Sequence, residues 1–534
     1  MKKKAYGLLA ALLVLLGAAC LAMGGVSQRA DYVAAAGAQS VYRLDVWQGR
    51  GTIYDRSLQP LVGGNTEIVA AVAPTIQAIG ALEKATSGQY RDRLAVALEN
   101  GQPFQLTLDR MVNDPLIDVF QVPQRYQENQ LAPHLIGYLD SLGNGAAGVE
   151  LAMNDVLAQN AGEISVTYRV DAVGRAIAGE EREVVNTQSR TAGGVALTVD
   201  SAIQEIAQQA AQRLDKGAVV VTQVPDCKIL ALASVPDFSP LDLTGAAQEE
   251  DSPLVNRGFS AYAPGSVFKL VTAAALLEEG LEEFTFPCEG SVNAGGMQFH
   301  CINNTAHGEQ DLTGALANSC NCYFISAARM LGGQKVLSMA YNLGFGTAQE
   351  FGRGLWTAAG ELPTLASLDN VRALANFSFG QGELTVTPLQ VCAMMNTIAS
   401  GGVYTSPKLI LGLVDEERQL QEQSSSSEKS LRVMKASTAS RLEDMLTNAA
   451  QEGTGKAGAP RNAMSGIKTG TAQTGVFQGE EELLHFWYSG IVWNGDQPGW
   501  CVTVLRESTT QDQGVTAQVF RQVAESLVSL AERN

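Results

Sequence analysis

The chain has 534 residues, of which 46% are hydrophobic and 17% charged, and its formal net charge is −18 at pH 7. This length exceeds that of an average domain, so two or more folded units are expected. The acidic balance argues against nucleic acid as a partner, because proteins that bind phosphate backbones gather lysine and arginine on one surface.

The N-terminus predicts a membrane anchor. Three lysines at positions 2–4 precede an uncharged stretch, 5–27, that is long enough to cross a bilayer as a helix. Only Arg29 follows closely, so the charge bias predicts a cytoplasmic tail, a single-pass helix in the cell membrane and an extracytoplasmic body. Two alternatives stay open at this point: a cleaved signal peptide and a lipoprotein cleavage site before Cys20.

The next part of the chain predicts extended structure and then a helix and a hairpin. Residues 28–191 mix short extended stretches with loops and lack a nucleotide-binding glycine loop. A helix is predicted within 197–217, because Asp200 or Ser201 can cap its first N–H groups and a glycine stops it. The segment GAVVVTQVPDCKILALAS (217–234) holds two β-rich runs around Pro-Asp, which predicts a hairpin.

The remaining chain predicts the other layers of an α/β sandwich. A Pro-Gly pair breaks the chain before a helix over 266–280, and the polar stretch 416–430 reads as a solvated surface loop. The stretch AQVFRQVAESLVSLAERN predicts a final helix. Three successive strands of an antiparallel sheet are predicted at SGIKTGTAQTG (465–475), HFWYSGIVW (485–493) and GWCVTVLRES (499–508).

The eight cysteines would lie mostly in an environment where disulfides persist. No CxxC pair with a matching set of His or Cys partners is present, so no structural zinc site is expected from spacing alone. No other pattern indicates a metal or a cofactor.

Ser-x-x-Lys occurs three times, and one copy lies where it could act. One copy falls in the polar stretch 416–430, and another starts at Ser465 on a strand, where positions i and i+3 point to opposite faces. Ser266 and Lys269, in YAPGSVFKL, instead open a predicted helix and share a face beside free backbone N–H groups. Apolar neighbours would lower the pKa of Lys269 and free its lone pair. The plain alternative is a capping serine and a snorkelling lysine.

Two more short motifs follow along the chain. Ser-Cys-Asn at 319–321 lies between two helical stretches, where its plain interpretation is a helix cap or a turn. Lys-Thr-Gly-Thr at 468–471 is the single Lys-Thr-Gly and lies on a predicted strand, where a glycine would let a substrate backbone approach closely.

In this order the three motifs match the three-part signature of penicillin-binding proteins and serine β-lactamases. The chain resembles a class B penicillin-binding protein over nearly its whole length. Weaker family marks are RGTIYDRSLQPL, HLIGYLD with GVELAMNDVL, NRGFSAYAPGS and GQGELTVTPLQ, although Gly380-Gln381-Gly382 by itself predicts no more than a tight turn. Ser57-Leu58 stands where the family commonly has a glycine turn, and the 217–234 hairpin lacks the family's glycine.

The resemblance implies a fold and a domain order. The fold is α/β (α+β): a penicillin-binding/serine β-lactamase-like sandwich with a central antiparallel sheet, plus a mostly extended N-terminal pedestal and one transmembrane helix. No segment resembles the glycosyltransferase domain of class A relatives. The implied parts are a cytoplasmic tail (1–4), a transmembrane helix (5–27), a pedestal or dimerisation domain (28–191) and a transpeptidase domain (192–534).

The resemblance also implies an activity and its partners. It points to a serine-type D-Ala-D-Ala transpeptidase that crosslinks peptidoglycan stem peptides in the cell wall and is trapped by β-lactam antibiotics. Its partners would be stem peptides, β-lactams, the membrane and a SEDS-family glycan polymerase, with roles in cell shape or cell division. No cofactor and no metal are implied.

Each motif residue receives a role from the resemblance. Ser266 is the nucleophile, Lys269 its base, kept neutral by its surroundings and by the charge of Lys468, and Ser319 relays a proton to the leaving amine. Backbone N–H groups of Ser266 and Thr471 form the oxyanion hole. The substrate amide and carboxylate are received at Asn321, Lys468, Thr469, Gly470 and Thr471.

Three hypotheses compete with or extend this interpretation. Cys301 and Cys320 could form a redox pair that distorts the site until reduced, with Cys288–Cys301 as a rival pairing and free buried thiols as the simplest case. A β-lactamase or β-lactam sensor shares all three motifs, although Glu361 lacks the surrounding pattern of a deacylating glutamate. A non-catalytic cell-wall scaffold is the third.

Overall fold

The computed structural model describes residues 2–27, 40–86, 90–177, 179–422 and 430–533. The chain divides into two compact units, and the predicted boundary between residues 191 and 192 is one of the division points. Two segments that we assigned to the first domain, 51–62 and 126–160, instead fold with the second unit. The reason is long-range pairing, since β2 (Thr52–Tyr54) pairs in parallel with β8 (Gly194–Leu197).

The N-terminal helix α1 (Lys2–Ser27) fits the predicted single-pass anchor. Its stretch Tyr6–Gly25 is long and apolar enough to cross a membrane, and none of it is buried against protein. Leucines that are exposed in this way are suited to a lipid environment.

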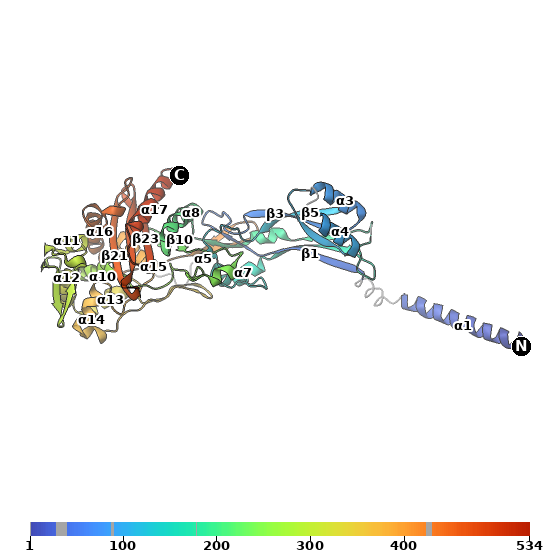
Figure 1. The fold of residues 1–534 in the computed structure, drawn as a ribbon, viewed down its shortest axis with the longest axis horizontal. Coiled ribbons are helices and arrows are strands. Elements are labelled where there is room, and N and C mark those ends of the chain that lie inside the picture. The colour runs from blue at the N-terminus through green and yellow to red at the C-terminus, as the bar shows by residue number, and fades with distance from the viewer. Residues whose placement is uncertain (1, 28–39, 87–89, 178, 423–429, 534) are drawn as a thin grey trace. The chain divides into compact units, whose positions relative to one another are not determined.

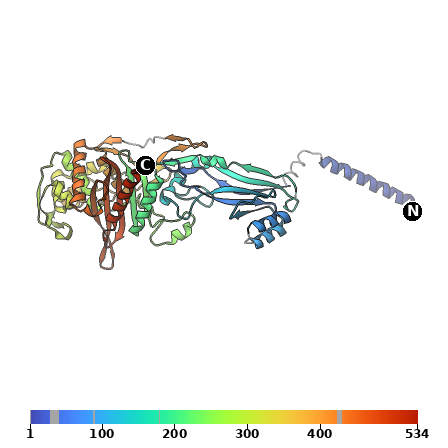
Figure 2. The same cartoon turned by 90° about the horizontal axis from the view of Figure 1, so that it is seen from above.

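The first unit contains more helix than the sequence predicted. Its strands form two three-stranded sheets, ordered β1-β6-β7 and β4-β3-β5. Thr75 caps the helix α3 by accepting from the Ala78 N–H at 3.2 Å, and Leu82 is buried one turn further on. Figure 2 shows α3 and α4 in blue. The elements are β1 (Val41–Gly49), β3 (Asn65–Val72), α3 (Ile76–Ala85), α4 (Arg91–Asn100), β4 (Phe104–Leu108), β5 (Ile117–Gln124), β6 (Gly162–Arg169) and β7 (Glu183–Asn186).

The second unit is built on a five-stranded antiparallel sheet in the order β10-β9-β23-β22-β21. The predicted hairpin forms its first two strands, and the three predicted late strands form the other three, so the predicted fold class is confirmed. Strand β21, which carries Lys-Thr-Gly, lies at one edge of this sheet (Figure 1). The strands are β9 (Gly217–Gln223), β10 (Ile229–Val235), β21 (Ser465–Gln478), β22 (Glu481–Asn494) and β23 (Gln497–Thr509).

Helices cover both faces of this sheet because its strands bury alternate residues on each side. In β9, Val219 and Val221 join the apolar cluster formed with α8 and α17, whereas Val220 joins the larger cluster on the opposite face. That opposite face is covered by α15 and α16. The helices are α8 (Ser201–Ala211), capped by Asp200 as predicted, α15 (Pro388–Ala399), α16 (Ala436–Gln451) and α17 (Val515–Ala531).

The larger cluster continues into a helical region that holds most of the motif residues. Its elements are η3 (Gly265–Phe268), α10 (Lys269–Glu278), β11 (Phe286–Cys288), β12 (Ser291–Ala294), β13 (Met297–His300), η4 (Ile302–Asn304), β14 (Gly308–Gln310), α11 (Leu312–Ala317), α12 (Asn321–Leu331), α13 (Gly333–Asn342), η5 (Ser367–Asp369) and α14 (Val371–Ser378).

Short elements complete the described chain, and one of them corrects a prediction. The stretch 416–430 is not a loop throughout, because β19 (Leu420–Glu422) pairs with β18 (Ile410–Val414); residues 423–429 lie outside the described part. The others are α5 (Pro133–Ile136), α6 (Gly148–Ala152), α7 (Asn154–Gln159), η1 (Gln188–Ala192), η2 (Gln212–Leu214), α9 (Leu243–Gln248), β15 (Glu350–Gly352), β16 (Leu355–Trp356), β17 (Val403–Thr405), β20 (Ser430–Arg432) and η6 (Lys456–Gly458).

Truncation of Phe520 tests how α17 is held on the sheet. This side chain is fully buried and packs on Tyr488 at a ring-centroid distance of 5.2 Å. Phe520→Ala is expected to lower the free energy of unfolding of the second unit by about 3–5 kcal/mol. Phe477→Ala is the control, since Phe477 is 62% exposed, and it should change stability by less than about 0.5 kcal/mol. Equal effects in denaturant titrations would contradict this packing.

Candidate active site

Ser266 and Lys269 lie on a 3₁₀ turn that leads into a helix. The helix predicted from Ser266 begins as η3, and α10 starts only at Lys269. The Lys269 N–H donates to the carbonyl of Ser266, three residues back. In a 3₁₀ helix side chains at i and i+3 eclipse, so the hydroxyl and the amine-bearing chain share one face.

Two glycines, Gly265 and Gly380, allow this turn to pack closely against two other segments of the site. Gly265 has φ +55°, and a Cβ there would collide with the carbonyl of Thr471. Its N–H donates to the carbonyl of Gly380 at 2.9 Å, and a Cβ on Gly380, whose φ is +87°, would collide with the carbonyl of Gly265. Only glycine suits both positions. The Gly-Gln-Gly motif, which alone predicted a tight turn, therefore also supports the turn that carries Ser266.

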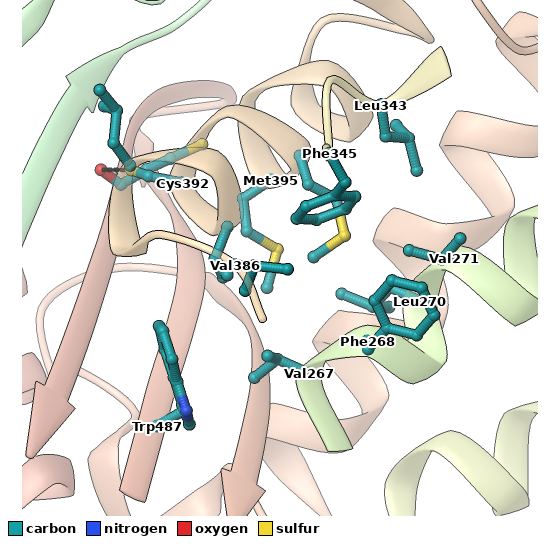
Figure 3. Packing of buried hydrophobic residues seen from close by; sticks show 14 of the residues in the cluster. Val267, Phe268, Leu270, Val271, Leu343, Phe345, Val386, Cys392, Met395 and Trp487 are labelled. Atoms are coloured by element: carbon teal, nitrogen blue, oxygen red, sulfur yellow. Dashed lines mark hydrogen bonds between the residues drawn. The ribbon is translucent and has the colours of Figure 1, made fainter. Parts of the chain in front are cut away.

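Apolar side chains of the turn pack into the buried cluster, as Figure 3 shows for Val267, Phe268 and their neighbours. The Phe268 ring packs on Phe345 and Phe377 at centroid distances of 5.8 and 4.9 Å. Trp487 of β22 donates from Nε1 to the carbonyl of Ala263 at 2.9 Å. These contacts leave the backbone around Ser266 little freedom.

The Ser-Cys-Asn motif lies in the turn between two helices, as predicted. Ser319 follows α11 with a left-handed φ of +54°, and Cys320 is the N-cap residue of α12, which begins at Asn321. Such a conformation is costly for a residue with a side chain, about 1–3 kcal/mol, and often marks a functional position. Here it aims the Ser319 hydroxyl at two lysines.

The amine of Lys269 is held by this turn. Its Nζ donates to the Ser319 carbonyl at 2.6 Å, to Asn321 Oδ1 at 2.7 Å and to Ser319 Oγ at 3.2 Å. The Asn321 amide is oriented in turn by donating to the carbonyl of His300 at 2.8 Å. Among the described residues the Ser266 hydroxyl has no hydrogen-bond partner, so it is the turn geometry that relates it to Lys269.

Lys468 reaches the same hydroxyl from the edge strand. Its Nζ donates to Ser319 Oγ at 3.0 Å and to the carbonyl of Thr469 at 2.9 Å. The structure thus brings the predicted side chains of Lys269, Ser319, Asn321 and Lys468 together, with Ser319 Oγ between the two amines.

Burial sets the charge state of both lysines. It lowers the pKa of Lys269 from 10.5 to about 7, while the nearby thiols of Cys320, Cys301 and Cys322 act in the opposite direction. Burial and the closeness of Lys269 lower the pKa of Lys468 well below 10.5. Burial, rather than the expected charge on Lys468, is therefore the cause of a neutral Lys269.

The other positions of the Lys-Thr-Gly strand have different surroundings. Thr469 and Thr471 are partly exposed, and Thr469 donates from Oγ1 to Thr454 Oγ1 at 2.9 Å. A Cβ on Gly470 would lie 2.8 Å from the carbonyl of Pro264. The glycine is thus needed for close packing of the protein's own turn, and not only for the substrate approach that the sequence suggested.

This fold and this set of side chains define a site of the kind found in penicillin-binding proteins and serine β-lactamases. Residues 217–525 match the family described as "Penicillin binding protein transpeptidase domain". The chain therefore belongs to this family, and the predicted resemblance to class B penicillin-binding proteins is confirmed.

Curated relatives agree with this assignment. Stage V sporulation protein D of Bacillus subtilis is 30% identical over 66% of this chain and 54% of its own length. Penicillin-binding protein PbpB of Mycobacterium tuberculosis is 32% identical over 73% of this chain and 58% of its own length. Peptidoglycan D,D-transpeptidase FtsI of Escherichia coli is 29% identical over 52% and 46%. The chain thus spans about half the length of these relatives.

Solved structures share the fold. Penicillin binding protein 3 of Mycobacterium tuberculosis, in complex with aztreonam, matches with a TM-score of 0.67 at 23% identity, covering 92% of this chain and 97% of that one. A peptidoglycan synthase complex, solved for its coordination of polymerization and crosslinking, matches with a TM-score of 0.68 at 22% identity, covering 96% of each chain.

Substitution of Gly265 tests the close approach of the serine turn to β21. Gly265→Ala is expected to lower the free energy of unfolding of the second unit by roughly 2–4 kcal/mol, because it adds a backbone collision to a positive φ. Gly280→Ala is the control: φ is +71° there as well, but no atom lies within 4 Å of the added Cβ. It should cost only about 1 kcal/mol. Equal losses would show that the two backbones do not meet.

Proposed function

We propose that the protein is a membrane-anchored peptidoglycan D,D-transpeptidase that acts through an acyl-serine at Ser266. The observation that supports this most directly is the fully buried amine of Lys269, with a pKa near 7, on the same turn face as that hydroxyl. A neutral amine at physiological pH can remove the proton of a serine that attacks a carbonyl.

The substrate would be a stem peptide ending in D-Ala-D-Ala. Ser266 Oγ attacks the carbonyl of the penultimate residue, and Lys269 takes the proton. The developing oxyanion would be received by the backbone N–H groups of Ser266 and Thr471. Two facts support this pairing: Gly265 packs against the Thr471 carbonyl, and β21 is an edge strand, so an extended peptide could align along it.

Proton delivery and carboxylate binding would fall to the remaining motif residues. Ser319 Oγ lies within hydrogen-bond distance of both amines and is suited to pass the proton on to the leaving D-alanine amine. Asn321 would bind the substrate amide. Lys468, Thr469 and Thr471 would receive the terminal carboxylate beside Gly470, and an amine from a neighbouring stem peptide would then take the acyl group.

A β-lactamase, a β-lactam sensor and a scaffold are less well supported. Glu361 is exposed and pairs through its backbone with Thr385, which is a poor place for a residue that activates a deacylating water. The intact, buried lysine pair argues against a scaffold with an inactive site, because two buried amines that served no function would only destabilise the fold.

We further propose that this activity lies outside the cell. Lysines 2–4 would keep the N-terminus cytoplasmic while α1 crosses the membrane. The part within 28–191 would serve as a pedestal or a dimerisation domain. The likeness to a peptidoglycan synthase complex supports a glycan polymerase as the partner, and we propose that it is of the SEDS family, as the resemblance implies.

Covalent labelling by a fluorescent penicillin tests the proposed function. The purified chain is expected to carry label that persists on a denaturing gel, and Ser266→Ala should reduce it below about 1% of wild type. Ser426→Ala, in another Ser-x-x-Lys of the same chain, is the matched control and should label fully. Label that appears and is lost within minutes would indicate a β-lactamase, and an unlabelled wild type would indicate a scaffold.

The pH dependence of acylation tests the role of Lys269. Its lowered pKa of about 7 means that the neutral, proton-accepting form grows as pH rises through 7. The second-order acylation rate should therefore rise about tenfold per pH unit below 7 and level off above about 8. A rate that keeps climbing up to pH 10 would show an ordinary lysine and would rule out this amine as the base.

A further inference from the structure

Beside the Ser-Cys-Asn turn lies a cluster of soft ligand atoms that the proposed reaction does not use. The Sγ atoms of Cys288, Cys301 and Cys320 and a ring nitrogen of His307 all lie within 4.8 Å of one another. The three cysteines are buried, and all are free thiols.

Three of the six separations within this cluster match those of ligands around one tetrahedral ion, and the other three are within 4.8 Å. Two thiolates on such an ion, each about 2.3 Å from it, lie about 3.8 Å apart. The Cys301 sulfur lies 3.7 Å from that of Cys288 and 3.8 Å from that of Cys320. For a thiolate and an imidazole the expected separation is about 3.5 Å, and Cys288 Sγ lies 3.4 Å from His307 Nδ1.

The fold assembles these ligands from four separate places in the chain. Pairing of β11 with β14 sets Cys288 opposite Gly308, so the neighbouring His307 comes alongside. Cys301 follows β13 and is fixed by its N–H donating to the Gly290 carbonyl at 2.9 Å. Cys320 caps α12. The spacing excluded a CxxC-type zinc site, but a site assembled through tertiary contacts leaves no such spacing.

The surroundings of Cys320 suit a metal-bound thiolate. Its sulfur accepts the backbone N–H of Tyr323 at 3.4 Å, as the outer-shell donors of metal sites do. It also lies at the N-terminus of an eleven-residue helix, where the dipole favours negative charge.

We propose that Cys288, Cys301, His307 and Cys320 bind one zinc ion as a structural Cys₃His site. Zinc is the divalent ion that such a closed set of three thiolates and one imidazole prefers. Binding replaces three thiol protons with one dication. The bound ion ties the segment 288–307 to the start of α12, and therefore to Ser319 and Asn321 on either side of Cys320.

The alternative to metal binding is oxidation of the same sulfurs to a disulfide. A Cys301–Cys320 disulfide, or Cys288–Cys301, would use the sulfur that is central to the cluster, so disulfide and metal exclude each other. The nearly equal distances of the Cys288 and Cys320 sulfurs from that of Cys301, together with the placement of His307, favour the ion over any single pair.

Metal content of the full-length chain, purified in detergent without a histidine tag from zinc-supplemented cells, tests the proposal. About one zinc per chain is expected. His307→Ala and Cys288→Ala should each weaken zinc binding by more than about 100-fold, since even outer-shell changes cost about 10–100-fold. Cys322→Ala is the matched control: its sulfur lies 3.6 Å from that of Cys301, yet it is outside the ligand set, and zinc should be retained.

A second measurement does not depend on variants. Cobalt(II) exchanged into the wild-type chain should give the near-ultraviolet thiolate charge-transfer band and the intense visible band of a tetrahedral site. Removal of the metal by a chelator should raise the rate of hydrogen exchange in residues 286–325 but not in α17. Three results would overturn the proposal. The wild-type protein could lack zinc, or both ligand variants could retain it. The unreduced, denatured protein could also show two fewer titratable thiols than its eight cysteines. None of these readouts depends on penicillin labelling.

Discussion

Two lysine amines, of Lys269 and Lys468, are buried completely and meet at one hydroxyl, that of Ser319. Burying an ammonium ion is expensive, which is why the pKa of each lysine falls, and the closeness of Lys269 lowers the pKa of Lys468 further. The structure around them has to supply hydrogen-bond acceptors for each N–H while keeping water out. The neutral amine that the proposed acyl transfer needs is thus a consequence of packing.

The segments around these lysines come from elements far apart in the chain, and glycine residues allow their backbones to approach closely. Gly265, Gly380 and Gly470 each lie where a methyl group would strike another segment's backbone. The serine turn is therefore pressed between the Gly-Gln-Gly loop and the edge strand. An edge strand is otherwise a liability in a soluble domain, since it offers unpaired backbone groups. Here the serine turn packs against that edge, through Gly265 at Thr471 and Gly470 at Pro264.

Local sequence patterns predicted many of the helices and strands, but they failed where the structure depends on contacts between distant parts of the chain. Asp200 as a cap, the hairpin of β9 and β10 and the three late strands could be predicted from neighbouring residues alone. The helix α3 was missed although Thr75 and Leu82 carry the usual cap and spacing. The folding of 51–62 with the second unit has no local signal, because it depends on a pairing with a strand more than a hundred residues away. The backbone contacts of Gly265 and Gly380 are of the same kind.

Three consecutive residues, 319–321, face two different sites, the lysine pair and the thiol cluster. The left-handed backbone at Ser319 turns its hydroxyl toward the lysines, while Cys320, the next residue, caps α12 and faces the thiol cluster. Asn321 returns to the lysine side. The residues on both sides of Cys320, Ser319 and Asn321, accept hydrogen bonds from Lys269, so a shift of the Cys320 backbone also moves the groups that hold this amine. Whatever binds those sulfurs therefore sets the position of the groups that hold the proposed base.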